Sequence, residues 1–210
     1  MFKKLLISGL LLAVFAGVGT AAVSFVHDKA LPRINAEEKE HLLETLHQFV
    51  PPETIDNDMY SDTIEVRDKA LLGTSDPITV YRARKGGAPV GLVLTAVAPD
   101  GYSGDIKLLI AIRYDGTLSG VRVISHHETP GLGDNIDSNR SSWIESFTGK
   151  SLRDPAEDQW HVKKDGGQFD QFTGATITPR AVVKAVANTL RYYQMHRDEL
   201  FAPASEKPHE

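Results

Sequence analysis

Cysteine is absent from the 210-residue chain. Without thiolates, the protein cannot form disulfides, bind an iron–sulfur cluster through sulfur or attach haem through a CxxCH motif. The absence does not assign a cellular compartment, but it narrows the redox options. Any electron chemistry that this protein performs requires an organic cofactor.

An excess of basic residues is also lacking. The chain has 23 Lys and Arg against 28 Asp and Glu, and Lys3 and Lys4 are its only charges before position 28. Residues 28–210 therefore hold 21 basic and 28 acidic side chains. This balance argues against nucleic-acid binding, which depends on Lys and Arg that neutralise phosphates. With 41% apolar and 24% charged residues, the composition is that of a globular protein, and the length suits one domain.

The longest uncharged run extends from Leu5 to Val26. As a helix, these 22 residues would be about 33 Å long, against a hydrocarbon core of roughly 30 Å. The alternative is a cleavable signal peptide, because positions 20–22 are small, but its apolar region is typically only about 7–15 residues long. We therefore favour an uncleaved anchor. The two N-terminal lysines then place residues 28–210 on the periplasmic side of a bacterial inner membrane.

Helical periodicity marks two segments. Asn35 and Glu38 have the spacing of a capping box, and a helical repeat follows until the prolines at 51 and 52 (Leu42, Leu43, Leu46, Phe49 and Val50). A second apolar face predicts a long helix from Pro179 onward (Val182, Val183, Val186, Leu190 and Tyr193). Residues 53–77, which are acidic and contain Pro and Gly, are expected to be irregular.

Four strands are predicted in two hairpins. Residues 78–84 and 90–96 flank Gly86-Gly87, and residues 106–114 and 118–125 flank Asp115-Gly116, a strong turn signal. We also expect a short helix at 142–147, a strand at 160–163 and a turn at 165–167. Together these elements indicate an α+β fold, with an antiparallel sheet flanked by helices.

The most informative segment for chemistry is DQFTGATITP at 170–179. It is a loop of small residues that leads into the C-terminal helix, with Thr178 expected as the N-cap and Pro179 as the first helical residue. From spacing alone, Thr178 is most simply a helix cap. The free N–H groups and the dipole of a helix start also suit a phosphate.

A second polar segment follows the last predicted strand. His126, His127 and Glu128 could suggest a metal site, but adjacent residues on a strand point to opposite faces, so we do not favour one. The residues at 130–133 shape a tight loop.

The stretch TGATIT at 173–178 closely resembles the [ST]GATx[ST] flavinylation motif of FMN-binding domains in ion-pumping respiratory complexes. Three further segments match that family: GYSG at 101–104, HETPGLG at 127–133, and the region 165–186 that contains the motif. Together with the N-terminal anchor and the length, they make the chain similar to the G subunits of Rnf (Rsx) electron transport complexes over nearly its whole length.

In that family, a flavin transferase splits FAD and joins FMN through a phosphodiester to the last Thr of the motif, which is Thr178 here. The resemblance implies supporting roles for the other motif residues (Thr173, Gly174, Ala175 and Thr176). It also implies that Thr129 and Leu132 lie against the flavin ring, with Gly131 in the same loop. Tyr102 and Ser103 are expected to line this site, although a plain turn suits them equally, and Lys164 could offset phosphate charge.

We expect a cytoplasmic stub (1–4), a transmembrane anchor (5–26), a helical linker region (27–75), an FMN-binding domain (76–201) and a polar tail (202–210). The expected function is electron transfer within a membrane complex that translocates ions, with the other subunits and the flavin transferase as partners. Two alternatives remain: a C subunit of the sodium-pumping quinone reductase, which shares the motif, and a periplasmic flavin-binding sensor or assembly protein.

The uncharged run predicts that the mature protein keeps its N-terminus. The purified protein should begin at Met1 or Phe2 and should require detergent, because an apolar helix of this length is stable only in a bilayer or micelle. Intact mass measurement tests this expectation. An N-terminus at Ala22 or beyond would identify a cleaved signal peptide instead.

Overall fold

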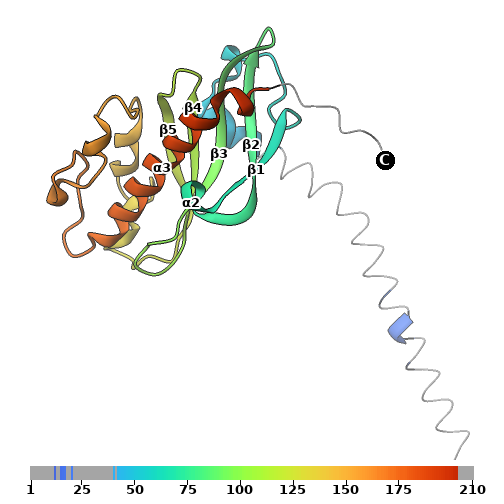
Figure 1. Ribbon diagram of the computed structural model, residues 1–210. Coiled ribbons are helices and arrows are strands. Elements are labelled where there is room, and N and C mark those ends of the chain that lie inside the picture. Colours follow the sequence, from blue (N-terminus) through green and yellow to red (C-terminus); the bar gives the residue numbers. More distant parts are fainter. Residues whose placement is uncertain (1–11, 13–14, 18–19, 21–39, 41, 203–210) are drawn as a thin grey trace, which may run out of the picture. The chain divides into compact units, whose positions relative to one another are not determined.

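A computed structural model of the protein describes residues 12, 15–17, 20, 40 and 42–202 (Figure 1). The chain divides into two compact units, Met1–Thr45 and Leu46–Glu210. The predicted anchor at 5–26 lies mostly outside the described residues, as does the expected capping box at Asn35 and Glu38. Within the described part of the chain, no helix has the length and apolarity needed to cross a membrane.

The second unit is built on a five-stranded antiparallel sheet whose strand order follows the sequence. Its strands are β1 (Thr63–Asp68), β2 (Thr74–Lys85), β3 (Ala88–Ala98), β4 (Ile106–Arg113) and β5 (Leu118–Ser125). Both predicted hairpins are confirmed. The two-residue turn between β2 and β3 needs positive φ at both positions, and Gly86 (φ 57°) and Gly87 (φ 78°) supply it.

The edge strand β1 was not predicted. The expectation that residues 53–77 are irregular is wrong, because they contain β1, the short helix α2 (Lys69–Leu72) and the start of β2. β1 is polar apart from Ile64 and Val66, which pair with Val80 and Ile78 of β2 and pack on the core. The sheet thus includes residues that precede position 76, where we expected the FMN-binding domain to begin.

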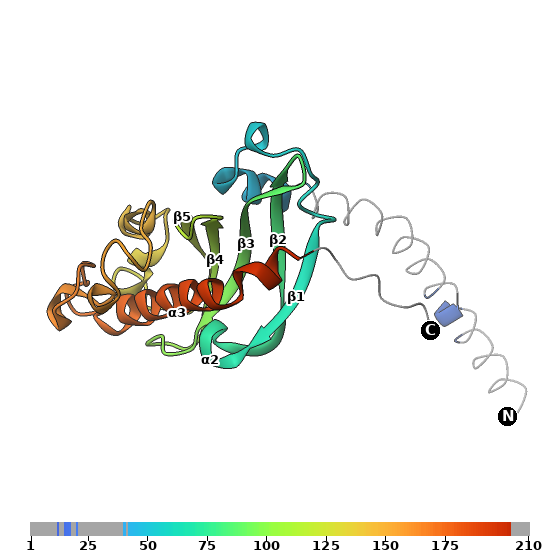
Figure 2. The ribbon, with the colours of Figure 1, turned by 45° about the horizontal axis from the view of Figure 1, so that its top comes forward.

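Helix α3 (Ile177–Leu200) packs across one face of the sheet, against β3 and β4 (Figures 1 and 2). The predicted apolar stripe of α3 is buried in the main core, which confirms the long helix. Alternate residues of β4 belong to the same core (Ile106, Leu108, Ile110 and Ile112). Because side chains alternate along a strand, this pattern places one face of β4 under the helix.

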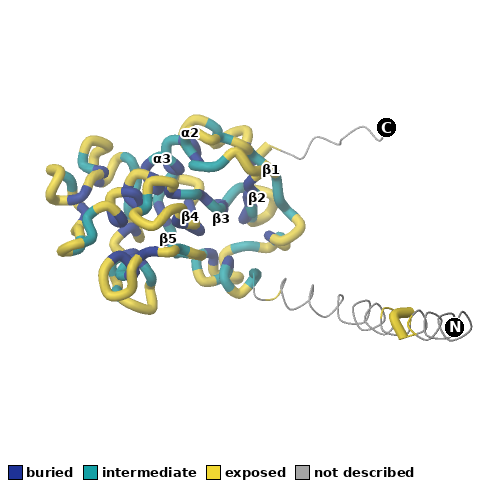
Figure 3. Tube along the Cα trace, turned by 90° about the horizontal axis from the view of Figure 1, so that it is seen from below, coloured by how far each residue is buried: buried dark blue, intermediate teal, exposed yellow. Residues whose placement is uncertain are grey.

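The opposite face of the sheet is covered by residues that precede it in sequence. Leu109 and Ala111, which alternate with the core residues of β4, are buried as well. The predicted helix is confirmed over 42–49, and the ring of Phe49 lies directly over Gly120 of β5, where a Cβ atom would be 2.5 Å from the ring. The sheet therefore lies between two layers (Figure 3).

Between β5 and α3 the chain forms loops with four short 3-10 helices: η2 (Gly133–Ile136), η3 (Trp143–Phe147), η4 (Glu157–Gln159) and η5 (Lys163–Asp165). The short helix expected at 142–147 is confirmed in this form. The strand expected at 160–163 is wrong, because only Val162 makes an isolated bridge, to Phe169. Side-chain packing holds this region instead: the ring centroids of Phe147 and Phe169 are 4.7 Å apart.

The start of α3 also differs from the expectation. Thr176 is the N-cap residue, so Thr178 and Pro179 are the second and third helical residues, and the prediction that Thr178 caps the helix is wrong. A turn before the helix explains the shift. Gly174 has a φ of 81° and the N–H of Ala175 donates to the carbonyl of Phe172, which lets the helix begin two residues earlier.

Asp62 ties the end of α3 to the sheet. Its carboxylate lies 2.5 Å from Nη2 of Arg82 and 3.0 Å from Nε of Arg84. The same guanidinium groups donate to the carbonyls of Ala202 and Phe201, at 2.8 and 2.9 Å. The side chain of Arg82 is only 5% exposed, so its charge depends on these partners.

We predict that Asp62→Ala lowers the free energy of unfolding by about 3–5 kcal/mol, because it leaves the buried guanidinium of Arg82 without a counter-charge. Urea denaturation measures the change. Glu157→Ala is the matched control: it removes an ion pair to Arg191 whose side chains are both more than a third exposed, so the loss should stay below about 1 kcal/mol. Equal losses in the two variants would contradict the role assigned to Asp62.

Candidate functional site

Three loops meet at one end of the sheet. In an antiparallel meander, successive strands run in opposite directions, so the end of β3, the start of β4 and the end of β5 lie at the same end of the sheet. The start of α3 reaches the same end (Figure 2). A cavity of about 320 Å³ lies between these segments. Its walls come from all three: Tyr102 from the first loop, Glu128, Thr129, Leu132 and Gly133 from the second, and residues 174–178 from the third.

The structure brings together most of the residues that the sequence singled out. Seven of them line this cavity: Tyr102, Thr129, Leu132, Gly174, Ala175, Thr176 and Thr178. Ser103, Gly131 and Thr173 belong to the same loops but are not among the lining residues. Lys164 is exposed and does not line the cavity, and its backbone N–H donates to Oε1 of Gln171 at 3.2 Å.

A buried hydrogen bond joins two of the loops. The hydroxyl of Thr178 is 0% exposed and donates to Oε2 of Glu128, in a short contact. Glu128 is itself 4% exposed, and its other oxygen accepts the backbone N–H of Ser103 at 3.0 Å. Among the described residues, no Lys, Arg or His side chain forms an ion pair with this carboxylate, so only neutral donors hold it.

Two glycines let the backbone close around this pair. A Cβ atom on Gly133 would lie 2.8 Å from Oε2 of Glu128 and 2.9 Å from Oγ1 of Thr178. A Cβ atom on Gly101 would lie 2.9 Å from Oε1 of Glu128 and still closer to the carbonyl of Gly104. Any side chain at either position would push the backbone away from the carboxylate.

Glu128, Gly133 and Ile177 line the cavity but were not predicted as site residues. Glu128 was considered only as a metal ligand. Its role depends on Thr178, which is 50 residues away in the sequence, and no spacing rule connects the two. Its position in the HETPGLG segment could have identified Glu128 as a site residue, because we assigned other residues of that segment to the site.

The mouth of the cavity is apolar. Tyr102, Leu132 and Ile177 are large apolar side chains that remain exposed around it. Next to them is the start of α3, where Thr176 makes no side-chain cap and Pro179 has no N–H. Within the described chain, the N–H groups of Ile177 and Thr178 have no acceptor. The arrangement combines an apolar surface for a planar group with donors for an anion.

An ion pair braces the outer side of this helix start. Nε and Nη2 of Arg180 lie 2.5 and 2.6 Å from the carboxylate oxygens of Asp165, which ends η5. The bond from Arg180 lowers the pKa of Asp165 below its ordinary value. Both side chains are exposed, so the pair positions the turn but is not part of the cavity.

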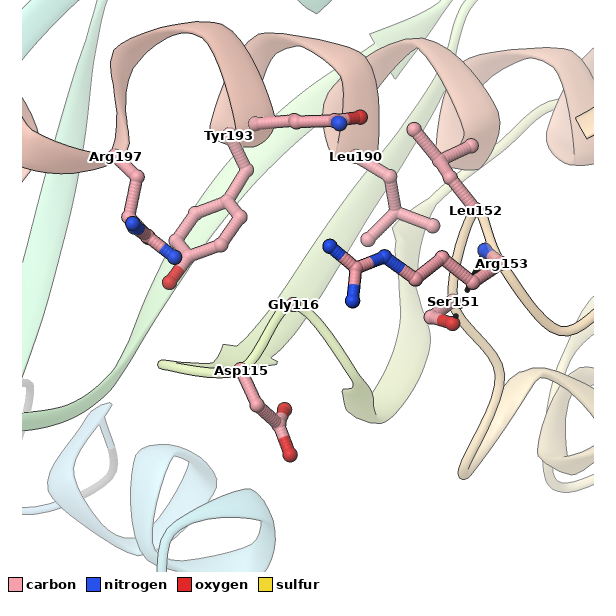
Figure 4. A pocket seen from close by; sticks show the side chains of 9 residues that line it. Asp115, Gly116, Ser151, Leu152, Arg153, Leu190, Tyr193 and Arg197 are labelled. Atoms are coloured by element: carbon pink, nitrogen blue, oxygen red, sulfur yellow. Dashed lines mark hydrogen bonds between the residues drawn. The ribbon is translucent and has the colours of Figure 1, made fainter.

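A smaller cavity of about 90 Å³ lies along the second half of α3 (Figure 4). Arg153, Tyr193 and Arg197 contribute to its walls, and it contains none of the predicted site residues. The hydroxyl of Tyr193 donates to the carbonyl of Tyr114 at 2.9 Å, and burial raises the pKa of this tyrosine. The candidate site is the cavity at the start of α3, because the predicted site residues gather there.

Comparison with known proteins identifies the family to which the chain is similar. A family model described as an FMN-binding domain matches residues 101–191, and one described as the RnfG N-terminal region matches residues 1–49. The chain is 45% identical over 202 residues to the G subunit of the ion-translocating oxidoreductase complex of Shewanella baltica (strain OS223), covering 96% of this chain and 95% of the relative.

The corresponding G subunit of Shewanella amazonensis (strain ATCC BAA-1098 / SB2B) is 46% identical over 201 residues, covering 96% of this chain and 94% of the relative. That of Aliivibrio fischeri (strain ATCC 700601 / ES114) is 45% identical over 193 residues, with 92% of each chain covered. Similarity thus extends over nearly the full length of each protein.

We predict that Gly133→Ala lowers the free energy of unfolding by about 1–3 kcal/mol, because the added methyl group meets two buried oxygen atoms. One of those atoms belongs to Thr178. In a Thr178→Ala background the same substitution should therefore cost less, and chemical denaturation of the two single variants and the double variant measures the difference. Strictly additive losses would contradict the packing of Gly133 against this hydroxyl.

Proposed function

This chain belongs to the family of G subunits of ion-translocating oxidoreductase (Rnf) complexes, and on that premise we propose that it carries FMN covalently on Thr178 and transfers electrons within such a complex. One observation carries the proposal. The segment that matches an FMN-binding domain contains every residue that lines the cavity, including the last threonine of TGATIT.

The residues present fit FMN. A volume of about 320 Å³ is at the lower end of the roughly 300–1,000 Å³ typical of ligand pockets, and this cavity is open at its mouth. The apolar side chains of Tyr102, Leu132 and Ile177 suit an aromatic ring, and Thr129 adds a polar contact. The free N–H groups at the start of α3 suit the phosphate, which a helix N-terminus stabilises by roughly 0.3–1 kcal/mol.

The proposal assigns a role to the residues at and just before the start of α3. Thr178 provides the hydroxyl oxygen that forms the ester. Gly174, with positive φ, turns the chain so that Thr176 and Ile177 border the cavity. Bound FMN supplies one- and two-electron redox chemistry, and hydrogen bonds, charge and solvent access around the ring tune it.

The burial of Thr178 has a consequence for attachment. Its hydroxyl lies beneath Gly133, so a phosphorus atom can approach only after the 129–133 loop moves away from the start of α3. A modifying enzyme can use its binding energy for that movement, which supports a dedicated flavin transferase as a partner. The other expected partners are the remaining subunits of the complex.

The membrane anchor and the periplasmic location belong to the same proposal. They rest on the uncharged run at 5–26 and on the two lysines before it. The match of residues 1–49 to the RnfG N-terminal region favours a G subunit over the C subunit of a quinone reductase. It also favours that assignment over a flavin-binding sensor.

We predict that Thr178→Ala abolishes covalent flavin when the full-length chain is co-expressed with a flavin transferase. The substitution removes the hydroxyl oxygen that the proposal assigns to the ester. It also leaves Glu128 with one donor fewer, so the free energy of unfolding should fall by about 1–3 kcal/mol, and thermal melts must show that the variant is folded. In-gel flavin fluorescence and peptide mass measure attachment, with FMN minus one water expected on the peptide that contains Thr178.

Thr176→Ala is the matched control, because it alters the same loop and leaves the Thr178 hydroxyl in place, so labelling should persist at equal or lower yield. Thr178→Ser keeps a hydroxyl and should label in part. The wild type expressed without the transferase should be colourless. Fluorescence that survives in Thr178→Ala, or a mass that maps to Thr173 or Thr176, would refute the assignment.

A further inference from the structure

The TGATIT segment is held at both ends and open in its middle. At its far end, the buried hydroxyl of Thr178 donates to Glu128. Near its beginning, Thr173 and Gly174 are exposed. A modifying enzyme meets this open stretch first, so the contacts on either side of it determine the conformation that the enzyme encounters.

Trp143, the first residue of η3, anchors the chain just before the open stretch. Its indole N–H donates to the carbonyl of Asp170 at 2.8 Å. Its ring meets the ring of Phe172 edge-on, with the centroids 5.2 Å apart. Within the described chain, no backbone N–H donates to the Asp170 carbonyl, so the indole is the group that fixes this carbonyl.

The other contacts of these residues are exposed. The carboxylate of Asp170 lies 2.6 Å from Nζ of Lys163, but both side chains are more than half exposed, and such ion pairs contribute little. The side chain of Gln171 accepts a backbone N–H in an exposed contact. Trp143 is half-buried and packs against the main core, so it is the firmest of these anchors.

Trp143 is also linked to the opposite wall of the cavity. Its backbone N–H donates to Oγ of Ser141 at 3.2 Å, and that hydroxyl donates to the carbonyl of Asn135 at 2.6 Å. The amide of Asn135 donates to the carbonyl of Leu132 at 3.1 Å. Leu132 faces the TGATIT segment, because a Cβ atom on Gly174 would lie 3.7 Å from its Cδ2. One residue outside the cavity thus connects the two loops that form its walls.

We propose that Trp143 is a positioning residue for flavin attachment, and that it holds the open stretch in the conformation that the flavin transferase binds. Without the indole, the stretch adopts more conformations, and the enzyme must order it on binding. The inference rests on the proposed attachment of FMN within TGATIT. It does not depend on which hydroxyl of the segment forms the ester.

Trp143→Phe tests this role. Phenylalanine keeps a ring for the aromatic contacts but has no N–H for the Asp170 carbonyl. The KM of the transferase for the full-length apoprotein should rise about 3- to 10-fold, as expected for the loss of one net hydrogen bond. The kcat should stay unchanged, because Trp143 does not line the cavity and the lost energy concerns binding alone.

Initial rates of FMN incorporation from FAD, followed by in-gel fluorescence at increasing concentrations of apoprotein, give both constants. An unchanged KM, or a lower kcat at unchanged KM, would overturn the proposal.

Trp160→Phe is the matched control, because Trp160 is the other tryptophan of the chain. Its indole N–H also donates to loop carbonyls, those of Ser151 and Pro155, at 3.2 and 3.3 Å. Both rings contact Phe147. The acceptors of Trp160 lie outside residues 170–178, so its variant should keep the wild-type KM. An equal rise in both variants would show a general loosening of the aromatic cluster and would contradict the role of Trp143.

Hydrogen exchange of the apoprotein provides a measurement without the transferase. The N–H of Ala175 donates to the carbonyl of Phe172 at 3.2 Å and reports on the turn in the open stretch. Its exchange should be about 3- to 10-fold faster in Trp143→Phe and unchanged in Trp160→Phe. Protection of this amide that is the same in Trp143→Phe as in the wild type would mean that the indole does not hold the loop.

The outcomes separate this inference from the proposed function. If Trp143→Phe is labelled with wild-type constants, Trp143 has no positioning role, while the attachment of FMN stands. If the wild type takes up no flavin in the presence of the transferase, both proposals fall together.

Discussion

The hydrogen bond between Thr178 and Glu128 connects the two halves of this domain. Glu128 follows the last strand of the meander, and Thr178 lies in the first turn of α3, which returns across the sheet. Between them are 3-10 turns and loops that have no place in the sheet. The bond joins the first turn of α3 to the loop after β5, and the cavity lies beside these two segments.

The bond also has an energetic side. A buried carboxylate with no cationic partner among the described residues is costly, and the two glycines that lie against it leave no room for a Cβ atom. Packing in the rest of the domain offsets the free-energy cost of burying this carboxylate. The main core continues from β4 under α3 into the aromatic cluster of Phe147, Trp160 and Phe169, and the far end of α3 is anchored through Asp62.

The cavity unites two surfaces with different chemistry. Its floor is polar and closed, with the hydroxyl, the carboxylate and the first amides of α3. Its mouth is apolar and open, formed by Tyr102, Leu132 and Ile177. A cofactor that is held by its phosphate and exposes one ring edge suits such a site, because the closed end fixes its position and the open end permits contact with an electron partner.

Local sequence was enough for the features that arise between neighbours in the chain. Gly86-Gly87 and Asp115-Gly116 specify turns through their own backbone preferences, and the apolar repeat of α3 specifies which side of the helix is buried. The resemblance of the TGATIT loop to a flavinylation motif could be identified for the same reason, because the motif consists of consecutive residues.

The other features depend on tertiary packing, because their causes lie far apart in the chain. The sequence of β1 is too polar to predict a strand. It forms one because the backbone groups along the edge of β2 pair with those of β1. Val162 has only Phe169 to pair with, so no strand forms there. Glu128 gains its role from a hydroxyl 50 residues away, through a contact that depends on how the sheet edge and α3 are packed.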